Sequence, residues 1–456
     1  MDTSAPAPTR PSRGDELDLR IDSLAYGGAG VARIDGYVVF VRDAVPGDRV
    51  RAVVTKRKRA YAEARTVEVV EPSPERVPPV ADHPGAPWQV LPYERQLEIK
   101  TAQVDDALRR IGKLDGFELE PIVPAVEQWR YRNKLEYSFG QDENGLLVCG
   151  FHAPGSWEQI LHVEDCLLAS ERGNEVRRAA LQWCRDQGLG AYDRRTQVGL
   201  LRNLVVREGR RTGDLQVRLV TSPQHVDLTG FAEAVGVASV LWTRAAGVGE
   251  TTAGGETEVL HGVEAIDEEL SVAGSHLRFR ISAEAFFQTN TEMAERLYGT
   301  AAEFAALKGW ERVYDLFCGI GTIGLSLAPR AGEVFGLEIV DEAIADAAAN
   351  ARQNEISNAK FFAADVRLAM RDLVEEAGRP DVLVVDPPRA GLSARIVRRI
   401  IEAAPKRIVY VSCNPTTLAP NAAQLVEAGW ALRRVRPVDM FPQTPHIECV
   451  ALLERT

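Results

Sequence analysis

One cysteine stands at a position where a thiol could act as a nucleophile. Cys413 follows residues 407–412, an apolar run that predicts a buried strand, and it precedes Asn414 and Pro415. At the carboxyl end of a strand in an α/β sheet, a side chain faces the crevice where ligands bind. A thiolate there can attack an electron-poor carbon. Most isolated cysteines are inert buried residues, which is our interpretation of Cys149, Cys184 and Cys318.

A carboxylate is predicted at the same edge. Residues 382–385 read as a buried strand that runs into Asp386-Pro387-Pro388-Arg389. An aromatic residue in the fourth position of such a motif is typical of methyl transfer to exocyclic nitrogens. Arg389 occupies that position here, which argues against an amino-group target. The alternative is a turn that ends the strand without a chemical role.

A glycine pattern predicts an adenosine-type cofactor. Residues 313–317 form a strand-like run, and Gly319, Gly321 and Gly324 follow it as G-x-G-x-x-G before an apolar helix. Glu338 closes the next predicted strand, where it could accept hydrogen bonds from ribose hydroxyls. A tight turn would explain the glycines alone. The strand, the glycines and the acid together favour a nucleotide-like ligand.

Dinucleotides and S-adenosylmethionine share this pattern, so later residues must separate them. Asp365 follows residues 361–364, where a third strand would end and an adenine-edge contact is expected. Together with Asp386 and Cys413, it favours S-adenosylmethionine over a dinucleotide.

A thiol beside a methyl sulfonium suggests methylation of a pyrimidine carbon. C5 of uracil is a poor nucleophile, but addition of a thiolate to C6 turns the ring into an enolate with electron density on C5. A base must then remove the C5 proton. Glu448, just before the last predicted strand at residues 449–453, is the candidate, although a surface carboxylate at a strand start would look the same. A base stacked in a helix would have to be flipped out to reach the thiol.

Composition and charge fit a globular protein. The chain has 456 residues, 45% hydrophobic and 26% charged, which predicts several folded domains. The sequence has no long uncharged apolar run that would predict a membrane span. Its first residues do not resemble a secretory signal. Six scattered cysteines are too few for a disulfide framework, so a cytoplasmic location is expected. The net charge of −11 is only a weak objection to nucleic acid, because binding depends on local patches.

Hydrophobic periodicity predicts the order of the elements. Short strands over residues 14–70 suggest a small oligonucleotide-binding barrel, and a proline-rich linker follows at 72–92. Helices are expected over 94–112, 170–188 and 284–307, with mostly strands over 121–282. From residue 313, strands and helices alternate, which predicts a parallel sheet.

The motifs resemble those of the RNA uracil-5 methyltransferases, which make 5-methyluridine in tRNA and 23S ribosomal RNA. The resemblance rests on four ordered motifs: Asp315-Leu316-Phe317-Cys318-Gly319, Asp386-Pro387-Pro388-Arg389-Ala390-Gly391, Tyr410-Val411-Ser412-Cys413-Asn414-Pro415, and Asp439-Met440-Phe441-Pro442 with Glu448. It covers residues 282–456 well, and residues 14–70 look like the TRAM domain of many members.

The resemblance implies an α/β fold: a class I, Rossmann-like methyltransferase domain with an N-terminal β-barrel and a central, mostly β domain. We expect a disordered tail at 1–12, a TRAM-like RNA-binding barrel at 13–70, a central domain at 71–93 and 124–281, and a methyltransferase domain at 94–123 and 282–456. The expected partner is an RNA, either tRNA or 23S ribosomal RNA. We expect the protein to act as a monomer and not to bind a membrane.

The resemblance also implies roles for individual residues. It makes Cys413 the nucleophile and Glu448 the proton acceptor, and it places Arg132 in a segment that faces RNA. The expected S-adenosylmethionine and base pocket is lined by Gln288, Phe317, Gly319, Gly321, Thr322, Glu338, Asp365 and Asp386.

One departure concerns an iron–sulfur cluster that several ribosomal-RNA members hold with clustered cysteines after the TRAM domain. The corresponding stretch, residues 82–89, has no cysteine here, and Cys166 is what remains of the set. One thiolate cannot hold a four-iron cluster, so we expect no cluster and no metal. His83 with Cys166 in another kind of metal site is a minor alternative.

Two other functions stay open at this point. A cytosine-C5 RNA methyltransferase needs the same attack on C6, but such enzymes usually present a second active-site cysteine, and none stands beside Asp386. An RNA-binding or RNA-folding factor with incidental catalytic residues is the second. The sequence leaves the RNA, its target nucleotide, the oligomeric state and the need for the barrel undetermined.

Overall fold

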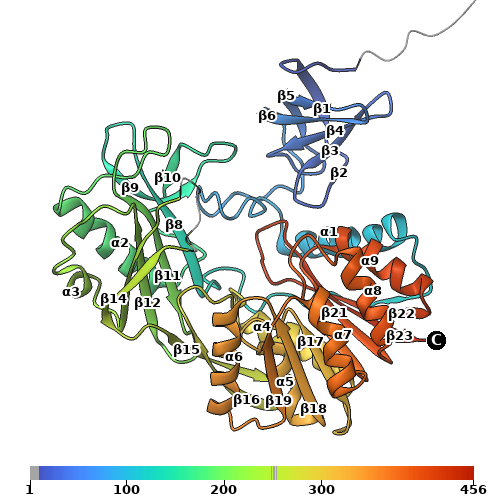
Figure 1. Cartoon of the computed structure of the whole chain (residues 1–456). Coiled ribbons are helices and arrows are strands. Elements are labelled where there is room, and N and C mark those ends of the chain that lie inside the picture. The colour runs from blue at the N-terminus through green and yellow to red at the C-terminus, as the bar shows by residue number, and fades with distance from the viewer. Residues whose placement is uncertain (1–9, 248, 250–251, 253) are drawn as a thin grey trace, which may run out of the picture. The chain divides into compact units, whose positions relative to one another are not determined.

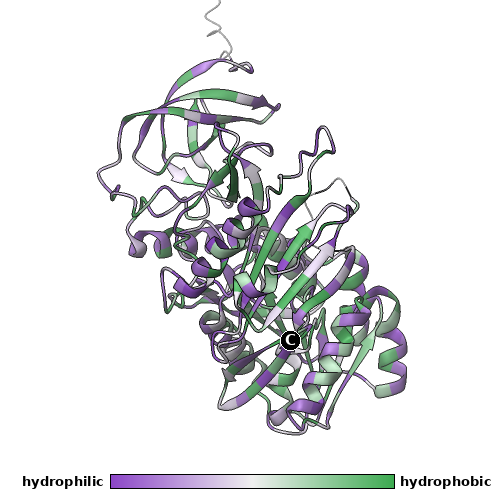
Figure 2. Cartoon of the chain, turned by 90° about the vertical axis from the view of Figure 1, so that its left-hand side faces the viewer, coloured by the Kyte–Doolittle hydropathy of each residue, from purple (hydrophilic) through white to green (hydrophobic). Residues whose placement is uncertain are grey.

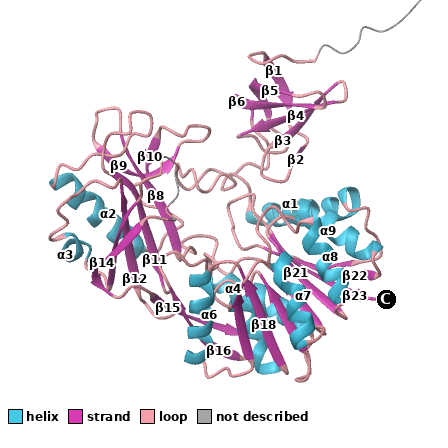
Figure 3. Ribbon diagram, viewed as in Figure 1, coloured by secondary structure: helices cyan, strands magenta, loops and turns pink. Residues whose placement is uncertain are grey.

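The structure, a computed structural model, describes residues 10–247, 249, 252 and 254–456 (Figure 1). The chain divides into two compact units. The first contains the residues up to 82, residues 86–106 and residues 441–447, and the second contains residues 83–85, 107–440 and 448–456. The domain boundaries expected from the sequence remain predictions. Strands and helices of both units are distinguished in Figure 3.

The first unit begins with a strongly bent β-sheet of short strands. Its strands are β1 (Glu16–Arg20), β2 (Ser23–Leu24), β3 (Gly30–Ile34), β4 (Tyr37–Arg42), β5 (Arg49–Arg57) and β6 (Tyr61–Glu71), in the order β1-β5-β6-β4-β3-β2. Alternate residues such as Val39, Val41 and Val50 are fully buried, as the period of a strand requires. Asp35 and Gly36 both have positive φ, as a tight hairpin turn needs. The expected barrel strands are present, and the structure adds the two-residue β2.

A buried carboxylate ties the end of β6 to this sheet. Asp48 is fully buried and accepts hydrogen bonds from the backbone N–H of Val45 (2.8 Å) and of Ser73 (2.9 Å). The Arg76 guanidinium donates to both of its oxygens, at 2.8 and 2.7 Å. A buried charge is tolerated when it is paired in this way.

Helix α1 (Tyr93–Asp106) belongs to the same unit and holds the segment that precedes Glu448 in the chain. Gln96 exchanges hydrogen bonds with the side chain (2.8 Å) and the backbone N–H (2.9 Å) of Gln443. Lys100 Nζ donates to the carbonyl of Phe441 at 3.0 Å. The helix expected over 94–112 is therefore present, and its last residues form the π-helical turn η1 (Ala107–Ile111).

The second unit contains a mixed sheet of the central region. Its strands are β8 (Lys134–Gln141), β9 (Leu147–His152), β10 (Ile160–His162), β11 (Leu201–Glu208), β12 (Leu215–Thr221), β13 (Ser239–Arg244) and β14 (Glu256–Gly262), in the order β10-β9-β8-β11-β12-β13-β14. Hydrophobic stretches run along these strands (Figure 2). The expected helix is α2 (Glu171–Asp186), capped by Ser170. The short α3 (Phe231–Val235), between two glycines with positive φ, was not expected.

The larger sheet of the second unit has the order β19-β18-β17-β20-β21-β23-β22-β7. Neighbouring strands from β19 to β21 are parallel, whereas β23 is antiparallel to both β21 and β22. Its strands are β17 (Arg312–Leu316), β18 (Glu333–Glu338), β19 (Ala359–Ala363), β20 (Val382–Val385), β21 (Arg407–Ser412), β22 (Trp430–Val438), β23 (Glu448–Arg455) and β7 (Glu118–Leu119). The expected class I α/β fold is confirmed.

Helices connect the parallel strands, as a parallel sheet requires. They are α5 (Thr322–Leu327) with η2 (Ala328–Arg330), α6 (Asp341–Gln353), α7 (Val366–Ala377) and α8 (Ala394–Ala403) (Figure 1). Helix α4 (Thr291–Ala305) precedes β17, and α9 (Pro415–Glu427) leads from β21 to β22. The hairpin β15 (Ile266–Val272) and β16 (Ser275–Ile281) precedes them. Within the described ranges, no helix is long and apolar enough to cross a membrane.

The helix expected from Glu284 was placed too early, because α4 begins at Thr291. Asn290 caps it by accepting a hydrogen bond from the N–H of Met293 at 3.2 Å. Residues 282–290 instead form a loop whose carbonyls are bound by side chains of distant strands. Arg207 of β11 donates to the carbonyls of Ser282 (3.0 Å) and Ala285 (2.7 Å). These tertiary contacts override the helical pattern.

Replacement of Asp48 by Ala should destabilise the N-terminal sheet, because two N–H groups and the Arg76 guanidinium lose their acceptor. Removing one member of a buried pair costs about 3–5 kcal/mol. Hydrogen exchange of the full-length protein should show faster exchange in peptides of β4, β5 and β6. Glu68→Ala is the control, since its ion pair with Arg51 is exposed and contributes about 0–1 kcal/mol. Equal protection in the two variants would contradict this role of Asp48.

Candidate active site

The candidate site lies where the strand order of the large sheet reverses. β17 is flanked by β18, which follows it in the chain, and by β20, which comes later, and all three are parallel. Crossover helices therefore leave in opposite directions at this point, and a crevice opens at the carboxyl ends of the strands. Glu338 ends β18, Asp386 follows β20 and Cys413 follows β21. Parallel pairing brings these three residues to one edge.

The antiparallel strand β23 brings Glu448 to the same edge. Because it runs against β21, its first residues lie where β21 ends, with Ser412 opposite Cys449. Glu448 and Cys413 are thus the adjoining residues of two paired strands. The Glu448 side chain is only 4% exposed, whereas Cys413 is half-buried. A buried carboxyl and a partly accessible thiol therefore stand next to each other.

The surroundings of Cys413 disfavour its thiolate form. Burial, with further contributions from the carboxylates of Glu448 and Asp386, raises the pKa of Cys413 to about 11. Arg389 acts in the opposite direction and lowers this pKa. The thiolate is accordingly favoured when the negative charge nearby decreases or the guanidinium comes closer.

Both carboxyls beside Cys413 are also shifted. Burial raises the pKa of Asp386 to about 7. Burial and the charge of Asp386 raise the pKa of Glu448 well above its usual range, and Arg389 opposes this. Carboxyls with raised pKa are stronger bases than exposed ones, and such groups cluster at active sites.

The glycine-rich turn after β17 leaves space at the same edge. Phe317, Gly319 and Gly321 all have positive φ, so the chain folds back sharply before α5. A Cβ on Gly319 would have nothing within 4 Å among the described residues, whereas one on Gly321 would meet the Phe361 ring at 3.0 Å. The backbone N–H of Gly319 donates to Glu338 at 3.3 Å. The turn thus offers an open face above Gly319 and a carboxylate beside it.

Beneath this turn lies a buried acid that sequence reasoning did not single out. Asp315, the residue before the end of β17, is fully buried, and one oxygen accepts a hydrogen bond from the N–H of Gly324 at 2.8 Å. Its other oxygen has no hydrogen-bond partner among the residues that the structure describes. Burial, opposed by that hydrogen bond, raises the pKa of Asp315 to about 7. In the sequence, Asp315 stands out only as the first residue of the 315–319 motif. A carboxylate inside an apolar strand is itself a sign of a functional residue.

Tyr298 of α4 is a second residue that the sequence did not reveal. It is buried, and its hydroxyl accepts a hydrogen bond from Thr322 at 3.3 Å. Burial raises the pKa of Tyr298, and Asp386, Asp315 and Glu448 act in the same direction. A tyrosine at helical spacing looks like an ordinary core residue, so only the tertiary structure relates it to the acids.

Asp365 has a structural partner in this structure. It caps α7 by accepting a hydrogen bond from the N–H of Arg367 at 2.8 Å, and the Arg367 guanidinium contacts both of its oxygens. The side-chain hydrogen bond with Arg367 lowers the pKa of Asp365. It lies two residues beyond the end of β19, and its contact with adenine remains a prediction.

The loop with Gln288 is held by the central region. Asn133 donates from its side chain to the carbonyl of Gln288 (2.9 Å) and to Thr291 (2.9 Å). Gln288 itself is 5% exposed, whereas the neighbouring Phe286 is 68% exposed. Arg132, expected to face RNA, is half-buried, and its backbone N–H donates to the carbonyl of Leu168 at 3.0 Å. The structure thus supports the loop of Gln288 and gives Arg132 only partial access to solvent.

His83 and Cys166, the two residues considered for a metal site, are in direct contact. His83 Nε2 lies 3.2 Å from Cys166 Sγ, and both side chains are buried. Burial lowers the pKa of His83. Over residues 10–247, 249, 252 and 254–456, no group of three or more His, Cys, Asp or Glu residues could hold a metal ion. The pair is a hydrogen bond between two protein segments, and the absence of a cluster stays a prediction.

Comparison with known proteins gives the family. A profile of the tRNA (uracil-5-)-methyltransferases matches residues 92–456, and the TRAM domain matches residues 11–67. The chain belongs to the tRNA (uracil-5-)-methyltransferase family. It is therefore a methyltransferase that carries an N-terminal TRAM domain.

Individual relatives are similar to this protein over nearly the full length of the chain. An uncharacterized RNA methyltransferase of Halalkalibacterium halodurans is 38% identical over 453 residues, which cover 97% of this chain and 98% of the relative. One of Bacteroides thetaiotaomicron is 39% identical over 461 residues, 94% and 100% of the two chains. The crystal structure of Pyrococcus abyssi tRNA (uracil-54, C5)-methyltransferase in complex with S-adenosyl-L-homocysteine has a TM-score of 0.78 and 27% identity, covering 96% of this chain and 99% of that one.

The protein should contain no stoichiometric iron. A cluster needs several thiolates, and Cys166 is hydrogen-bonded to His83 instead. Protein purified without oxygen should lack the broad visible absorption of iron–sulfur clusters. Iron and acid-labile sulfide in stoichiometric amounts would overturn this expectation.

Proposed function

We propose that the enzyme transfers a methyl group from S-adenosylmethionine to C5 of a specific uridine in RNA, through a covalent bond between Cys413 and C6. The observation that carries the proposal is the meeting of a partly accessible thiol, a buried carboxyl and a glycine-rich turn at one edge of the sheet. None of these groups is near another in the sequence. Together they match the requirements of pyrimidine C5 methylation.

The residues at the glycine turn fit S-adenosylmethionine. The open face at Gly319 leaves room for a ligand, and Glu338 is suited to ribose hydroxyls. Asp315 near the turn has a buried oxygen without a hydrogen-bond partner in the described part of the chain. The remaining contacts would come from residues around this turn and the neighbouring strand ends: Gln288, Phe317, Gly321, Thr322, Asp365 and Asp386. When bound, the cofactor supplies an electrophilic methyl group on a positively charged sulfur.

Cys413 supplies the nucleophile. Its thiolate forms a bond to C6 of the uracil, and the electron pair of the C5–C6 double bond moves onto C5 and O4. C5 then carries the electron density needed to accept the methyl group. The resulting C5 bears both a methyl group and a hydrogen atom, and the ring remains attached to Cys413.

Glu448 completes the cycle by accepting the C5 proton. As the C–H bond breaks, its electrons re-form the C5–C6 double bond and expel the Cys413 thiolate. The raised pKa of Glu448 makes its carboxylate a better base than an exposed glutamate would be. Its position beside Cys413 at paired strand ends supports this role.

Arg389 favours the reactive form of Cys413. It lowers the pKa of Cys413 and of Glu448, and so opposes the burial that raises both. Arg389 follows β20 and is exposed to solvent, so an RNA phosphate could also reach its guanidinium. A cation at this place suits a thiolate mechanism better than an aromatic residue would.

The substrate is expected to reach this edge as an unstacked uridine, because the ring of a stacked base is inaccessible to a thiol. We propose tRNA or 23S ribosomal RNA as the substrate and a monomer in the reducing cytoplasm as the acting form. The TRAM domain gives the chain an RNA-binding module of its own. The similarity to an archaeal tRNA methyltransferase makes tRNA the first substrate to test.

Nucleoside mass analysis tests the function. Purified enzyme with S-adenosylmethionine and unmodified tRNA or ribosomal RNA should produce 5-methyluridine. 5-Methylcytidine would favour the cytosine-C5 reaction instead. No methylated nucleoside with either RNA, despite tight RNA binding, would favour an RNA-binding factor. Mapping 5-methyluridine in total RNA from a deletion strain would identify the target.

RNA with 5-fluorouridine at the target position should form a stable adduct with the enzyme. Fluorine on C5 cannot leave as a proton, so the bond between Cys413 and C6 persists after methyl transfer. The adduct should migrate more slowly in denaturing gels and should be absent with Cys413→Ala. Cys149→Ala, a change at a buried cysteine outside the site, is the matched control and should still form the adduct. Adduct formation by Cys413→Ala would remove Cys413 as the nucleophile.

Glu448→Gln should slow turnover by about 10²–10⁴-fold, the usual effect of losing a general base. The change also removes an anion that raises the pKa of Cys413, so the adduct should form at lower pH than in the parent enzyme. Because the base that releases the product is lost, the adduct with ordinary uridine should accumulate. Its formation should depend on pH with a midpoint at lower pH than in the parent enzyme. A near-normal rate, measured as methyl groups transferred per minute, would exclude Glu448 as the base.

A further inference from the structure

The central region contains a pocket that the proposed reaction does not use. It has a volume of about 250 Å³ and lies at the β10-β9-β8-β11 side of the central sheet, under the loops that follow β9 and α2. Its lining includes Phe139, Trp157, Ile160, Tyr192, Arg194 and Arg195. The methyl-transfer residues described above are not among those that line it. It is thus a separate concave site on the same chain.

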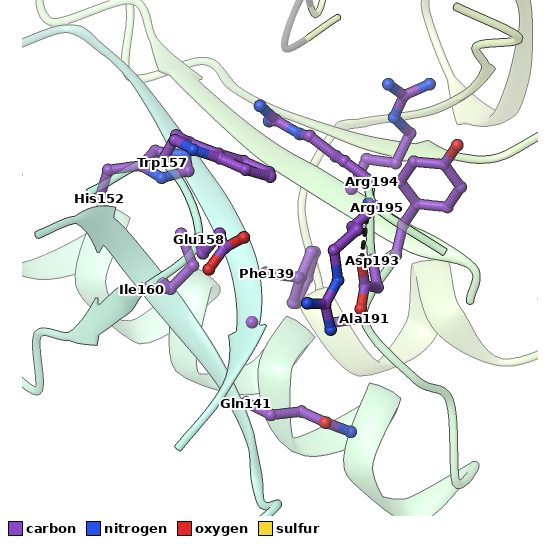
Figure 4. Close-up of a pocket in the computed structure, with 13 residues that line it drawn as sticks. Phe139, Gln141, His152, Trp157, Glu158, Ile160, Ala191, Asp193, Arg194 and Arg195 are labelled. Carbon is purple, nitrogen blue, oxygen red and sulfur yellow. Dashed lines mark hydrogen bonds between the residues drawn. The ribbon is translucent and has the colours of Figure 1, made fainter. Parts of the chain in front are cut away.

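The floor of this pocket is apolar, and one wall is an exposed indole. Phe139 and Ile160 are 5% and 7% exposed, whereas Trp157 is 55% exposed. Figure 4 shows Trp157 and Glu158 on one side of the pocket, with Phe139 at its centre. An exposed aromatic ring at the wall of a pocket can serve as a stacking surface for an unstacked base.

Guanidinium groups form the opposite wall. Arg194 and Arg195 lie there in Figure 4, on a turn organised by Asp193, which accepts hydrogen bonds from the N–H of Arg195 (2.7 Å) and Thr196 (3.1 Å). Both bonds reach the same oxygen, Oδ1, and they lower the pKa of Asp193. Arg194 and Arg195 supply the cations of this wall, and the carboxylates of Asp193 and Glu158 also line the pocket.

A buried arginine fixes the back of this wall. Arg202 is 7% exposed and donates to the carbonyl of Ala245 at 2.8 Å. Its guanidinium also lies 4.8 Å from the centre of the Tyr192 ring. The tyrosine next to the arginine turn is thus held in place by a buried residue, whereas Trp157 and Arg195 are exposed to solvent.

The size and the side chains of the pocket indicate which kind of ligand it can bind. A volume of about 250 Å³ is below the ~300–1,000 Å³ of pockets for drug-sized ligands, and it suits a fragment such as one nucleotide. Indole and guanidinium planes stack on bases, and arginine binds phosphate. An acidic peptide would use the arginines but would leave the exposed indole without a function.

We propose that this pocket binds one unstacked nucleotide of the RNA substrate, away from the uridine that is methylated. The base stacks on Trp157 over the floor formed by Phe139 and Ile160, and Arg195 contacts the phosphate. This inference rests on the proposed function, because it assumes that the substrate is RNA. It gives the central region a role in substrate recognition.

Binding of a single-stranded RNA probe tests the pocket directly. The probe is a fluorescein-labelled ten-nucleotide oligouridylate, with an oligoadenylate of the same length, measured by fluorescence anisotropy with the full-length protein. Trp157→Ala should raise the Kd by roughly 5- to 100-fold, the loss of stacking on one base. Trp310→Ala, another exposed tryptophan (60% exposed), is the matched control and should leave the Kd unchanged.

The charged wall has its own readout. Arg195→Ala should weaken binding and reduce the slope of log Kd against log salt by about 0.7, as expected for one phosphate contact with a single strand. Arg178→Ala, an exposed arginine of α2, is the control. In methyl-transfer assays the pocket variants should raise KM for RNA and leave the rate at saturating RNA unchanged.

Failure of this proposal can be told apart from failure of the proposed function. An unchanged Kd and salt slope in both pocket variants, with methyl transfer by the parent enzyme intact, would overturn the pocket and keep the reaction. Loss of probe binding in the variants, without any methyl transfer by the parent, would keep the pocket and overturn the reaction. Crosslinking of a 4-thiouridine probe should map to peptides with Trp157 or Arg195, and crosslinks elsewhere alone would count against the pocket.

Discussion

The pairing of Ser412 with Cys449 places a thiol and a carboxyl side by side, although they belong to strands that run in opposite directions. In a parallel arrangement, the start of β23 would lie at the far edge of the sheet and Glu448 would be a strand length away from Cys413. The antiparallel β23 thus brings two strand ends together in one candidate site. Asp386 reaches the same edge because β20 lies parallel to β21.

Bringing acids together in a buried place has an electrostatic cost. Burial raises the pKa of Asp386 and of Asp315 to about 7, and it raises the pKa of Glu448 well above its usual range. Each charge disfavours ionisation of the others, and the carboxylates of Glu448 and Asp386 raise the pKa of the Cys413 thiol. A positively charged sulfonium at the glycine turn would favour the ionised forms of the nearby groups. In the proposed mechanism, the ligand thereby helps to create the nucleophile that uses it.

The rest of the second unit supports this edge. Arg207 and Asn133 of the central region hold the loop of residues 282–290, which contains Gln288, so the central region contributes to the position of a residue expected at the site. Where some relatives are expected to use an iron–sulfur cluster, His83 and Cys166 are joined by a buried hydrogen bond. The exposed Trp157 and the arginine turn lie outside these supporting contacts, which is why they suggest a separate role in binding RNA.

The sequence by itself determined the class I fold, the glycine turn, and the strand ends that carry Asp386 and Cys413, because local patterns of period two and short turn motifs encode them. It misplaced the start of α4, since the loop of residues 282–290 is held by Arg207 from a distant strand. It also missed Tyr298 and the buried oxygen of Asp315 that has no hydrogen-bond partner within the residues the structure describes. Their importance comes from burial beside other acids, and burial is decided by contacts between residues far apart in the chain. Only the tertiary structure could bring Glu448 to Cys413 and Trp157 to the arginine turn.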